Sequence, residues 1–299
     1  MRIYRYWARA KESCTQGAQT FDVSTYGGSN LSVEDALRQA EERARAASRA
    51  IEHGSIGDEY AYSDRPLREE IVDEIGGEAV ITRNAYGAQV INTPDVLFAD
   101  VDLAEGGMAS RLMNALADLL RRPSPKADDP WSRIGDGDGP NLPNVPGGVG
   151  RQIVLRLQRI VDVDRRMGLR LYRTHGGFRV LATTRTYQAD RPEAERLMTD
   201  LGTDPLYMRL CRAQDCFRAR LSPKPWRCGL EVPPTRFPRE SDASQQRFEG
   251  WLRTYEQATR SYATCAFIGT FGREEVHPAV APVLEAHDRL ACAVDAPLA

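Results

Sequence analysis

The stretch that most constrains the fold of this chain is residues 95–103, an apolar run of β-strand type that contains two aspartates near its end. Successive side chains of a strand point to opposite faces, so Asp100 and Asp102 point the same way and Val101 points the other. Two carboxylates at this spacing repel each other unless a cation neutralises them. The run therefore predicts a strand whose charged end needs a positive partner.

A divalent metal ion is one such partner. Oxygen ligands suit Mg²⁺ or Mn²⁺, which keep several waters and bind through one or two carboxylates together with substrate phosphates. This interpretation makes Asp100 and Asp102 the candidate catalytic and metal-binding residues. The alternative is that both aspartates only end a strand, where water or arginine side chains neutralise them, and the sequence leaves the two interpretations open.

Composition sets outer limits on the class of protein. At 299 residues the chain is long enough for one large domain or two modest ones. No apolar run approaches the roughly 18 residues of a membrane span, and the charged, aromatic N-terminus is unlike a signal peptide. We therefore expect a cytoplasmic protein with no membrane partner. The net charge of −2 means that any contact with nucleic acid would come from a local basic patch.

Periodicity and turn residues predict an α+β chain. Because three strand-like segments follow one another before residue 103, we expect a mixed, largely antiparallel sheet flanked by helices rather than a regular βαβ repeat. Helices are expected at about residues 32–51, 66–75, 108–122, 150–167, 192–201, 245–260 and 279–291, and strands at 2–10, 79–83, 86–92, 95–103, 169–174, 178–184, 206–210 and 264–270.

This pattern suggests an N-terminal α/β part at residues 1–78, a core at 79–230, and a C-terminal helical part at 231–299 packed on the core. Residues 123–150 are rich in proline, glycine and aspartate and hold little that could pack, which predicts a long mobile loop within the core. The sequence does not predict an oligomeric state.

Residues 209–227 form the local basic patch that nucleic-acid binding would need, since they carry several cations against the single acid Asp215. Guanidinium groups bind phosphate oxygens in a bidentate manner, and two aromatic residues among the charges suit contact with bases. The alternative is a solvated basic face paired with acids elsewhere. The candidate substrate-binding residues of this segment are Arg212, Arg218, Arg220 and Lys224.

The six cysteines form no Cys-x-x-Cys pair, so reduced thiols are expected. Cys211, Cys216 and Cys228 lie close in sequence and could bind zinc with Cys265 or His277 as the fourth ligand. Because the spacing matches no known zinc motif, we favour buried cysteines without a metal.

Three features occur in a fixed order: the Asp100-x-Asp102 strand, a hairpin reading Tyr-Arg-Thr-His-Gly-Gly-Phe-Arg-Val at residues 172–180, and the basic segment. This order resembles the archaeo-eukaryotic primase superfamily, in particular the divergent branch of plasmid replication-initiation primases. The similarity is confined to short motifs between residues 79 and 227. It implies a primase-like, RRM-like core.

In that superfamily the Asp-x-Asp strand binds a divalent metal, the hairpin motif contacts the nucleotide, and a later acid completes the metal site. The resemblance thus implies substrate-binding roles for Thr174, His175 and Arg179, with Arg179 standing where the superfamily motif has a histidine. Asp204 and Asp215 are the nearest candidates for the third acid.

The expected function is metal-dependent nucleotidyl transfer, with Mg²⁺ or Mn²⁺, acting on nucleoside triphosphates and on DNA or RNA. Three alternatives stay open. The protein could bind nucleotide or nucleic acid without catalysis, hydrolyse phosphate esters with the same metal site, or act as an accessory protein whose aspartates only end a strand.

Overall fold

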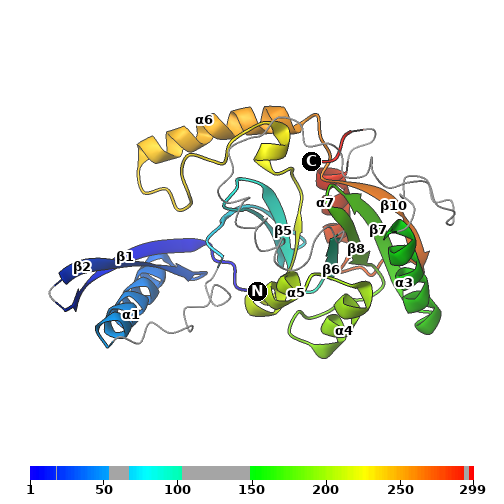
Figure 1. Cartoon of the computed structure of the whole chain (residues 1–299), viewed down its shortest axis with the longest axis horizontal. Helices are drawn as coiled ribbons and strands as arrows, with labels where there is room; N and C mark the ends of the chain where they lie inside the picture. The colour runs from blue at the N-terminus through cyan, green and yellow to red at the C-terminus, as the bar shows by residue number, and fades with distance from the viewer. Residues whose placement is uncertain (18, 54–66, 103–148, 293–295) are drawn as a thin grey trace.

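The computed structural model describes residues 1–17, 19–53, 67–102, 149–292 and 296–299. The predicted helix at 108–122 and most of the predicted loop at 123–150 lie outside these residues. Within them the chain is a mixed α+β protein, with antiparallel sheets flanked by helices (Figure 1).

The first sheet carries the aspartate strand at its edge. Its strands are β6 (Phe98–Asp102), β7 (Gly168–Thr174), β8 (Gly177–Ala182) and β10 (Cys265–Gly272), in the order β10-β7-β8-β6, with every neighbouring pair antiparallel. Gly177 lies so close to β6 that a Cβ atom there would stand 2.1 Å from the carbonyl oxygen of Val101. Glycine is therefore required for β8 to pair with β6 at this end.

The second sheet lies beside the first and is also antiparallel between neighbours. It contains β3 (Glu70–Ile75), β4 (Ala79–Arg83), β5 (Gln89–Thr93) and β9 (Phe217–Arg220), in the order β3-β4-β5-β9. One hydrophobic core spans both sheets, with Ile81 and Ile91 from the second and Phe98 and Leu169 from the first all buried.

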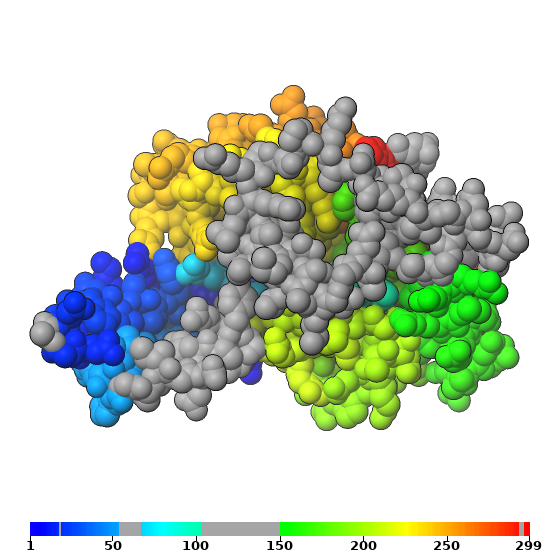
Figure 2. Space-filling view, in the orientation of Figure 1, coloured from blue at the N-terminus to red at the C-terminus, as the bar shows by residue number. Residues whose placement is uncertain are grey.

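A hairpin and a helix at the N-terminal end form a projection at one end of the molecule (Figures 1 and 2). They are β1 (Tyr6–Gln16), β2 (Gln19–Ser29) and α1 (Val33–Glu52), which packs on the hairpin through a stripe of buried alanines. Alanine and glycine permit this close packing, since a Cβ atom on Gly27 would lie 2.0 Å from the Ala36 carbonyl oxygen.

The other helices surround the two sheets. In Figure 1, α6 lies on the opposite side of the molecule from α4 and α5, while α3 and α7 lie with the first sheet. These helices are α3 (Val149–Val163), α4 (Pro192–Leu201), α5 (Pro205–Gln214), α6 (Asp242–Thr259) and α7 (Ala281–Ala291), together with the 3₁₀ turn η4 (Pro225–Cys228). Among the described residues, none of the helices has the length and apolar character needed to cross a membrane.

A partly buried tyrosine joins the two sheets. The hydroxyl oxygen of Tyr207, on α5, lies 3.1 Å from the Phe98 carbonyl oxygen of β6 and 2.8 Å from the Arg218 carbonyl oxygen of β9. It also accepts a hydrogen bond of 3.2 Å from the Arg218 N–H. Tyr207 thus satisfies backbone groups of β6 and β9, which are not paired with each other in either sheet.

Most predicted helices and strands are confirmed, but two are wrong. Residues 70–75, predicted as part of a helix, form strand β3, because pairing with β4 outweighs the helix preference of a glutamate-rich segment. Residues 206–210, predicted as a strand, lie in α5, which begins at Pro205 and is capped by the Asp204 side chain. The hairpin strand β2 was not predicted at all.

The sheets also cross the predicted domain boundaries. The boundary at residue 78 falls between β3 and β4, which pair in one sheet, and β10 makes the segment after residue 230 part of the first sheet. The C-terminal segment is therefore not only helical.

We predict that Tyr207→Phe destabilises the protein by about 1–3 kcal/mol, because it leaves buried backbone groups of β6 and β9 without a partner. Urea unfolding measures the change. Tyr262→Phe is the matched control, since no hydrogen bond of the Tyr262 hydroxyl is found among the described residues, and it should change stability by no more than about 0.5 kcal/mol. Equal stability of the two variants would contradict the bridging role of Tyr207.

Candidate functional site

The aspartate of β6 is held by an arginine of the neighbouring strand. Asp100 lies directly opposite Arg179 of β8, whose Nε donates to Oδ1 at 2.8 Å and whose Nη2 donates to Oδ2 at 3.1 Å. The Arg179 side chain is 2% exposed and that of Asp100 37%. Burial alone would lower the pKa of Arg179, but the Asp100 carboxylate raises it, so the guanidinium is a permanent cation beneath the aspartate.

Arg179 also connects three elements. Its Nη1 donates to the Arg220 carbonyl oxygen of β9 at 2.8 Å and lies 3.4 Å from Nε2 of His287 on α7. Arg179 therefore does not extend into solvent as a substrate-binding side chain. It lies inside the fold and fixes the Asp100 carboxylate at the edge of the sheet.

The backbone of a third acidic residue, Asp204, contacts the backbone of Asp100. The Asp204 N–H donates to the Asp100 carbonyl oxygen at 3.4 Å, so the start of α5 stands beside the end of β6. The Asp204 side chain caps α5 by accepting a hydrogen bond of 3.1 Å from the Leu206 N–H. Asp215, the other candidate for a third acid, lies past the opposite end of α5 and pairs with the N-terminal amine at 2.8 Å. The structure thus brings Asp204, and not Asp215, to the aspartate strand.

The half-buried cation Arg220 lies close to the same strand. Its pKa is lowered to about 10, by desolvation first and by the neighbouring cations Arg227 and Arg179, while Asp100 acts in the opposite direction. Its hydrogen-bond acceptors among the described residues are backbone oxygens, those of Ser222 at 3.3 Å and Ala299 at 3.5 Å. A cation in these surroundings favours the approach of an anion.

The other basic candidates are engaged elsewhere. Arg218 makes two hydrogen bonds, of 2.9 and 2.7 Å, to the carboxylate of Glu69. Arg212 lies on the exposed side of α5, where it pairs with Glu195 at 2.6 Å. The basic segment therefore does not form one phosphate-binding face.

The hairpin candidates lie at the Asp102 end of the sheet, since Gly177 pairs with both Asp102 and Thr174. His175 is in the β7–β8 turn, with Nδ1 3.0 Å from the Leu298 carbonyl oxygen, and Thr174 pairs with Gly177 at the end of the hairpin. The Lys224 ammonium lies 5.1 Å from the centre of the Trp226 ring. Of the predicted site residues, the structure brings Arg179 and Arg220 to Asp100.

In the described residues, no group of potential metal ligands is formed by the three cysteines considered for zinc, Cys211, Cys216 and Cys228. Cys211 and Cys216 are buried, and burial raises the pKa of the two thiols to about 12 and about 11. Over the parts of the chain that the structure describes, the one group of three potential metal ligands is Cys265, His287 and Cys292. No sequence pattern linked these residues, since His287 is far along the chain from Cys265 and neither cysteine belongs to a zinc motif.

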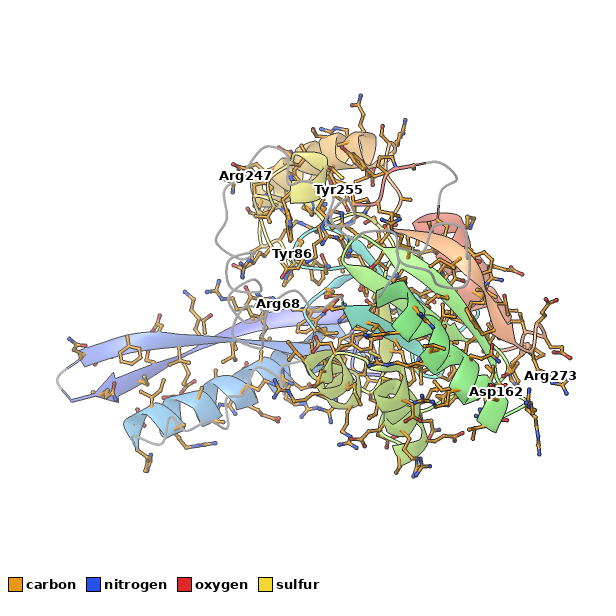
Figure 3. All side chains as sticks on the ribbon, turned by 45° about the vertical axis from the view of Figure 1, so that its right-hand side comes forward. Arg68, Tyr86, Asp162, Arg247, Tyr255 and Arg273 are labelled. Carbon is orange, nitrogen blue, oxygen red and sulfur yellow. The ribbon has the colours of Figure 1, made fainter. Side chains whose placement is uncertain are left out.

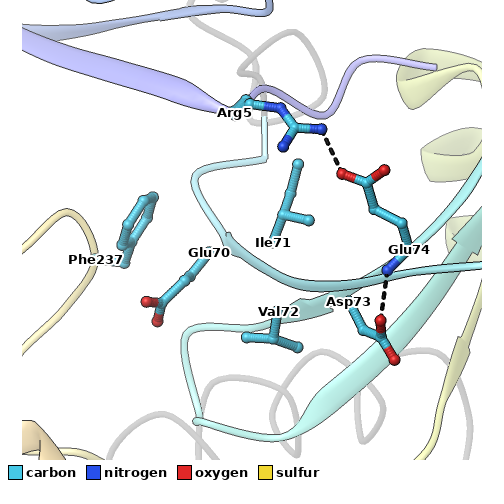
Figure 4. A pocket seen from close by; sticks show the side chains of 7 residues that line it. All are labelled: Arg5, Glu70, Ile71, Val72, Asp73, Glu74 and Phe237. Carbon is cyan, nitrogen blue, oxygen red and sulfur yellow. Dashed lines mark hydrogen bonds and ion pairs between the residues drawn. The ribbon is translucent and has the colours of Figure 1, made fainter.

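Neither of two cavities contains the Asp100 site. One, of about 400 Å³, lies along β3, and Figure 4 shows its Glu74 paired with Arg5. The other carboxylate, that of Glu70, pairs with Arg239. The other, of about 860 Å³, is lined by residues of α1, β2 and the segment 233–239. Its wall includes Arg68, labelled in Figure 3.

Comparisons of the chain with protein-family models, with curated proteins and with solved structures each give no match.

We predict that Asp100→Asn destabilises the protein by about 3 kcal/mol, the lower end of the range for a buried pair, because water partly screens Asp100. Arg179→Met should cost less, since it leaves a carboxylate that water can reach rather than a buried cation. The loss of unfolding free energy in the double variant should be smaller than the sum of the losses in the two single variants.

Urea unfolding of the unaltered protein, the two single variants and the double variant gives the coupling energy between Asp100 and Arg179, which is the difference between the double change and the sum of the single changes. The exposed pair of Arg212 and Glu195 is the control and should show a coupling of no more than about 1 kcal/mol. If the coupling at Asp100 and Arg179 were as small as that of the control, the pair would not hold the strand end in place.

Proposed function

We propose that this protein is a metal-dependent nucleotidyltransferase that acts on nucleoside triphosphates and nucleic acid. The observation that carries the proposal is the backbone contact between Asp204 and Asp100. It brings the backbone of a third acidic residue to an Asp-x-Asp strand, and such an acid is the component that the primase-like sequence pattern left unassigned.

Asp100 and Asp102 would hold Mg²⁺ or Mn²⁺ through carboxylate oxygens, and the Asp204 carboxylate, which caps α5 in this structure, would have to turn toward the ion to join them. The ion would lower the pKa of the attacking hydroxyl and stabilise charge on the attacking and leaving oxygens. Arg220 would bind the triphosphate, because its guanidinium lies near Asp100 among other cations. The N-terminal end of α5, beside the same strand, adds a favourable field for phosphate.

The Asp100–Arg179 pair is compatible with a metal. An ionised carboxylate has about four lone-pair positions, and Arg179 uses one on each oxygen. In this proposal Arg179 positions Asp100. The other two ligands of the ion come from Asp204 and from Asp102, which is exposed at the strand end.

A second candidate function is binding of nucleotide or nucleic acid without catalysis. The bidentate hold of Arg179 on Asp100 favours it, because this arginine already neutralises the carboxylate that a metal would need. Such a protein would bind its ligand through Arg220 and neighbouring cations, with strong dependence on salt and none on divalent metal.

The experiment compares the unaltered protein with Asp102→Asn, Asp204→Asn and the control Asp162→Asn. Asp162 lies on α3, away from the strand end (Figure 3). We predict that the first two variants lose Mn²⁺ binding, measured by calorimetry, and lose primer elongation by about a hundredfold or more. The control should keep both, and circular dichroism checks that every variant folds.

The other outcomes separate the alternatives. Release of nucleoside monophosphate without elongation would point to a phosphoesterase. Salt-dependent nucleic-acid binding that is unchanged by chelator, with no Mn²⁺ binding, would support the non-catalytic function and overturn the first proposal.

A further inference from the structure

Two cysteines and a histidine meet behind the first sheet. Cys265 begins β10, His287 lies on α7, and Cys292 follows that helix. The Cys265 Sγ lies 3.5 Å from the Cys292 Sγ and 3.7 Å from Nε2 of His287, and all three atoms lie within 4.8 Å of one another. Cys265 and His287 are fully buried, and Cys292 is half-buried.

These separations match the edges of a tetrahedral zinc site. Bonds of about 2.3 Å from zinc to sulfur and about 2.0–2.1 Å to nitrogen place neighbouring ligand atoms about 3.5–3.8 Å apart. Such bonds place two sulfurs about 3.8 Å apart and a sulfur and a nitrogen about 3.6 Å apart, and the measured 3.5 and 3.7 Å lie within about 0.3 Å of these values. Soft thiolates and imidazole select zinc over the hard ions Mg²⁺ and Mn²⁺.

The second nitrogen of the histidine is held as in zinc proteins. Nδ1 of His287 lies 3.0 Å from Oδ1 of Asp288, which also accepts a hydrogen bond of 2.8 Å from the Tyr172 hydroxyl. The other oxygen of Asp288 accepts from Arg170 at 2.8 Å. With its proton on Nδ1, the imidazole presents the Nε2 lone pair to the two sulfurs. Ligating histidines commonly donate to a carboxylate in this way.

The charges around the cluster also balance when a zinc ion is present. Two thiolates neutralise Zn²⁺, Asp100 neutralises Arg179, and Asp288 neutralises Arg170. Arg179 is the nearest cation, and its Nη1 donates one hydrogen bond of 2.8 Å to the Arg220 carbonyl oxygen and a longer one of 3.4 Å to Nε2 of His287. Zinc binding would replace the longer bond at Nε2, and Nη1 would keep its bond to Arg220.

We propose that Cys265, His287 and Cys292 bind one zinc ion, with a water molecule as the fourth ligand. Metal binding releases the thiol protons of both cysteines. The site would fasten the segment after α7 to the edge of the sheet, where Cys265 and Cys292 already form a β-bridge. It is separate from the carboxylate site and does not depend on the proposed function.

The test measures zinc in the full-length protein by mass spectrometry of the metal after dialysis against excess zinc and removal of loosely bound ions. We expect about one zinc per chain. Cys292→Ser and Cys265→Ser should lose it, while Asp288→Asn should weaken binding by about 10–100-fold. Cys228→Ser, which removes a half-buried cysteine outside the cluster, and Asp102→Asn, which alters the carboxylate site, should both retain the zinc.

A second measurement uses the unaltered protein, so it does not depend on whether the variants fold. Replacing zinc with Co²⁺ should produce thiolate-to-cobalt charge-transfer absorption and the visible bands of tetrahedral cobalt. The absence of stoichiometric zinc and of these bands would overturn the proposal. A disulfide between Cys265 and Cys292 in metal-free native protein would also overturn it. The short distance between the two sulfurs would then reflect disulfide formation rather than metal binding.

Discussion

The pairing of Arg179 with Asp100 is the interaction on which the centre of this structure depends. A fully buried guanidinium requires an anion, and the carboxylate directly opposite on β6 supplies it through two hydrogen bonds. This requirement fixes the register of β6 against β8, because a shift by one residue would place Val101 opposite the cation. The position of Asp102 at the exposed strand end follows from the same register.

The same arginine lies between the two sheets and the C-terminal helix. Its third contact reaches the Arg220 backbone of β9, close to the point where Tyr207 bridges β6 and β9. No backbone hydrogen bonds pair β6 with β9 in either sheet. The side chains of Arg179 and Tyr207 connect the two sheets there instead. The carboxylates, Arg220 and the start of α5 are therefore positioned by these side chains rather than by loops, which favours a site of fixed geometry.

The two proposed metal sites use different chemistry on opposite sides of Arg179. Oxygen ligands at the strand end suit a hard ion that meets substrate, whereas sulfur and nitrogen ligands in the interior suit zinc. Arg179 contacts Asp100 on one side and His287 on the other. A zinc ion would keep His287 neutral and so limit repulsion of Arg179, which is a physical link between the interior cluster and the carboxylate site.

The sequence by itself determined the local features: the β6 strand, the β7–β8 hairpin, most helices, and the co-facing arrangement of Asp100 and Asp102, since all follow from periodicity and turn residues. Only the tertiary structure decided the partners. Residues 70–75 form a strand because they pair with β4. The packing of α5 places Asp204, rather than Asp215, beside the backbone of Asp100. The tertiary structure also paired Arg218 with Glu69 and brought Cys265 to His287. The sequence does not predict these contacts, because contacts between distant segments leave no periodic signal in the chain.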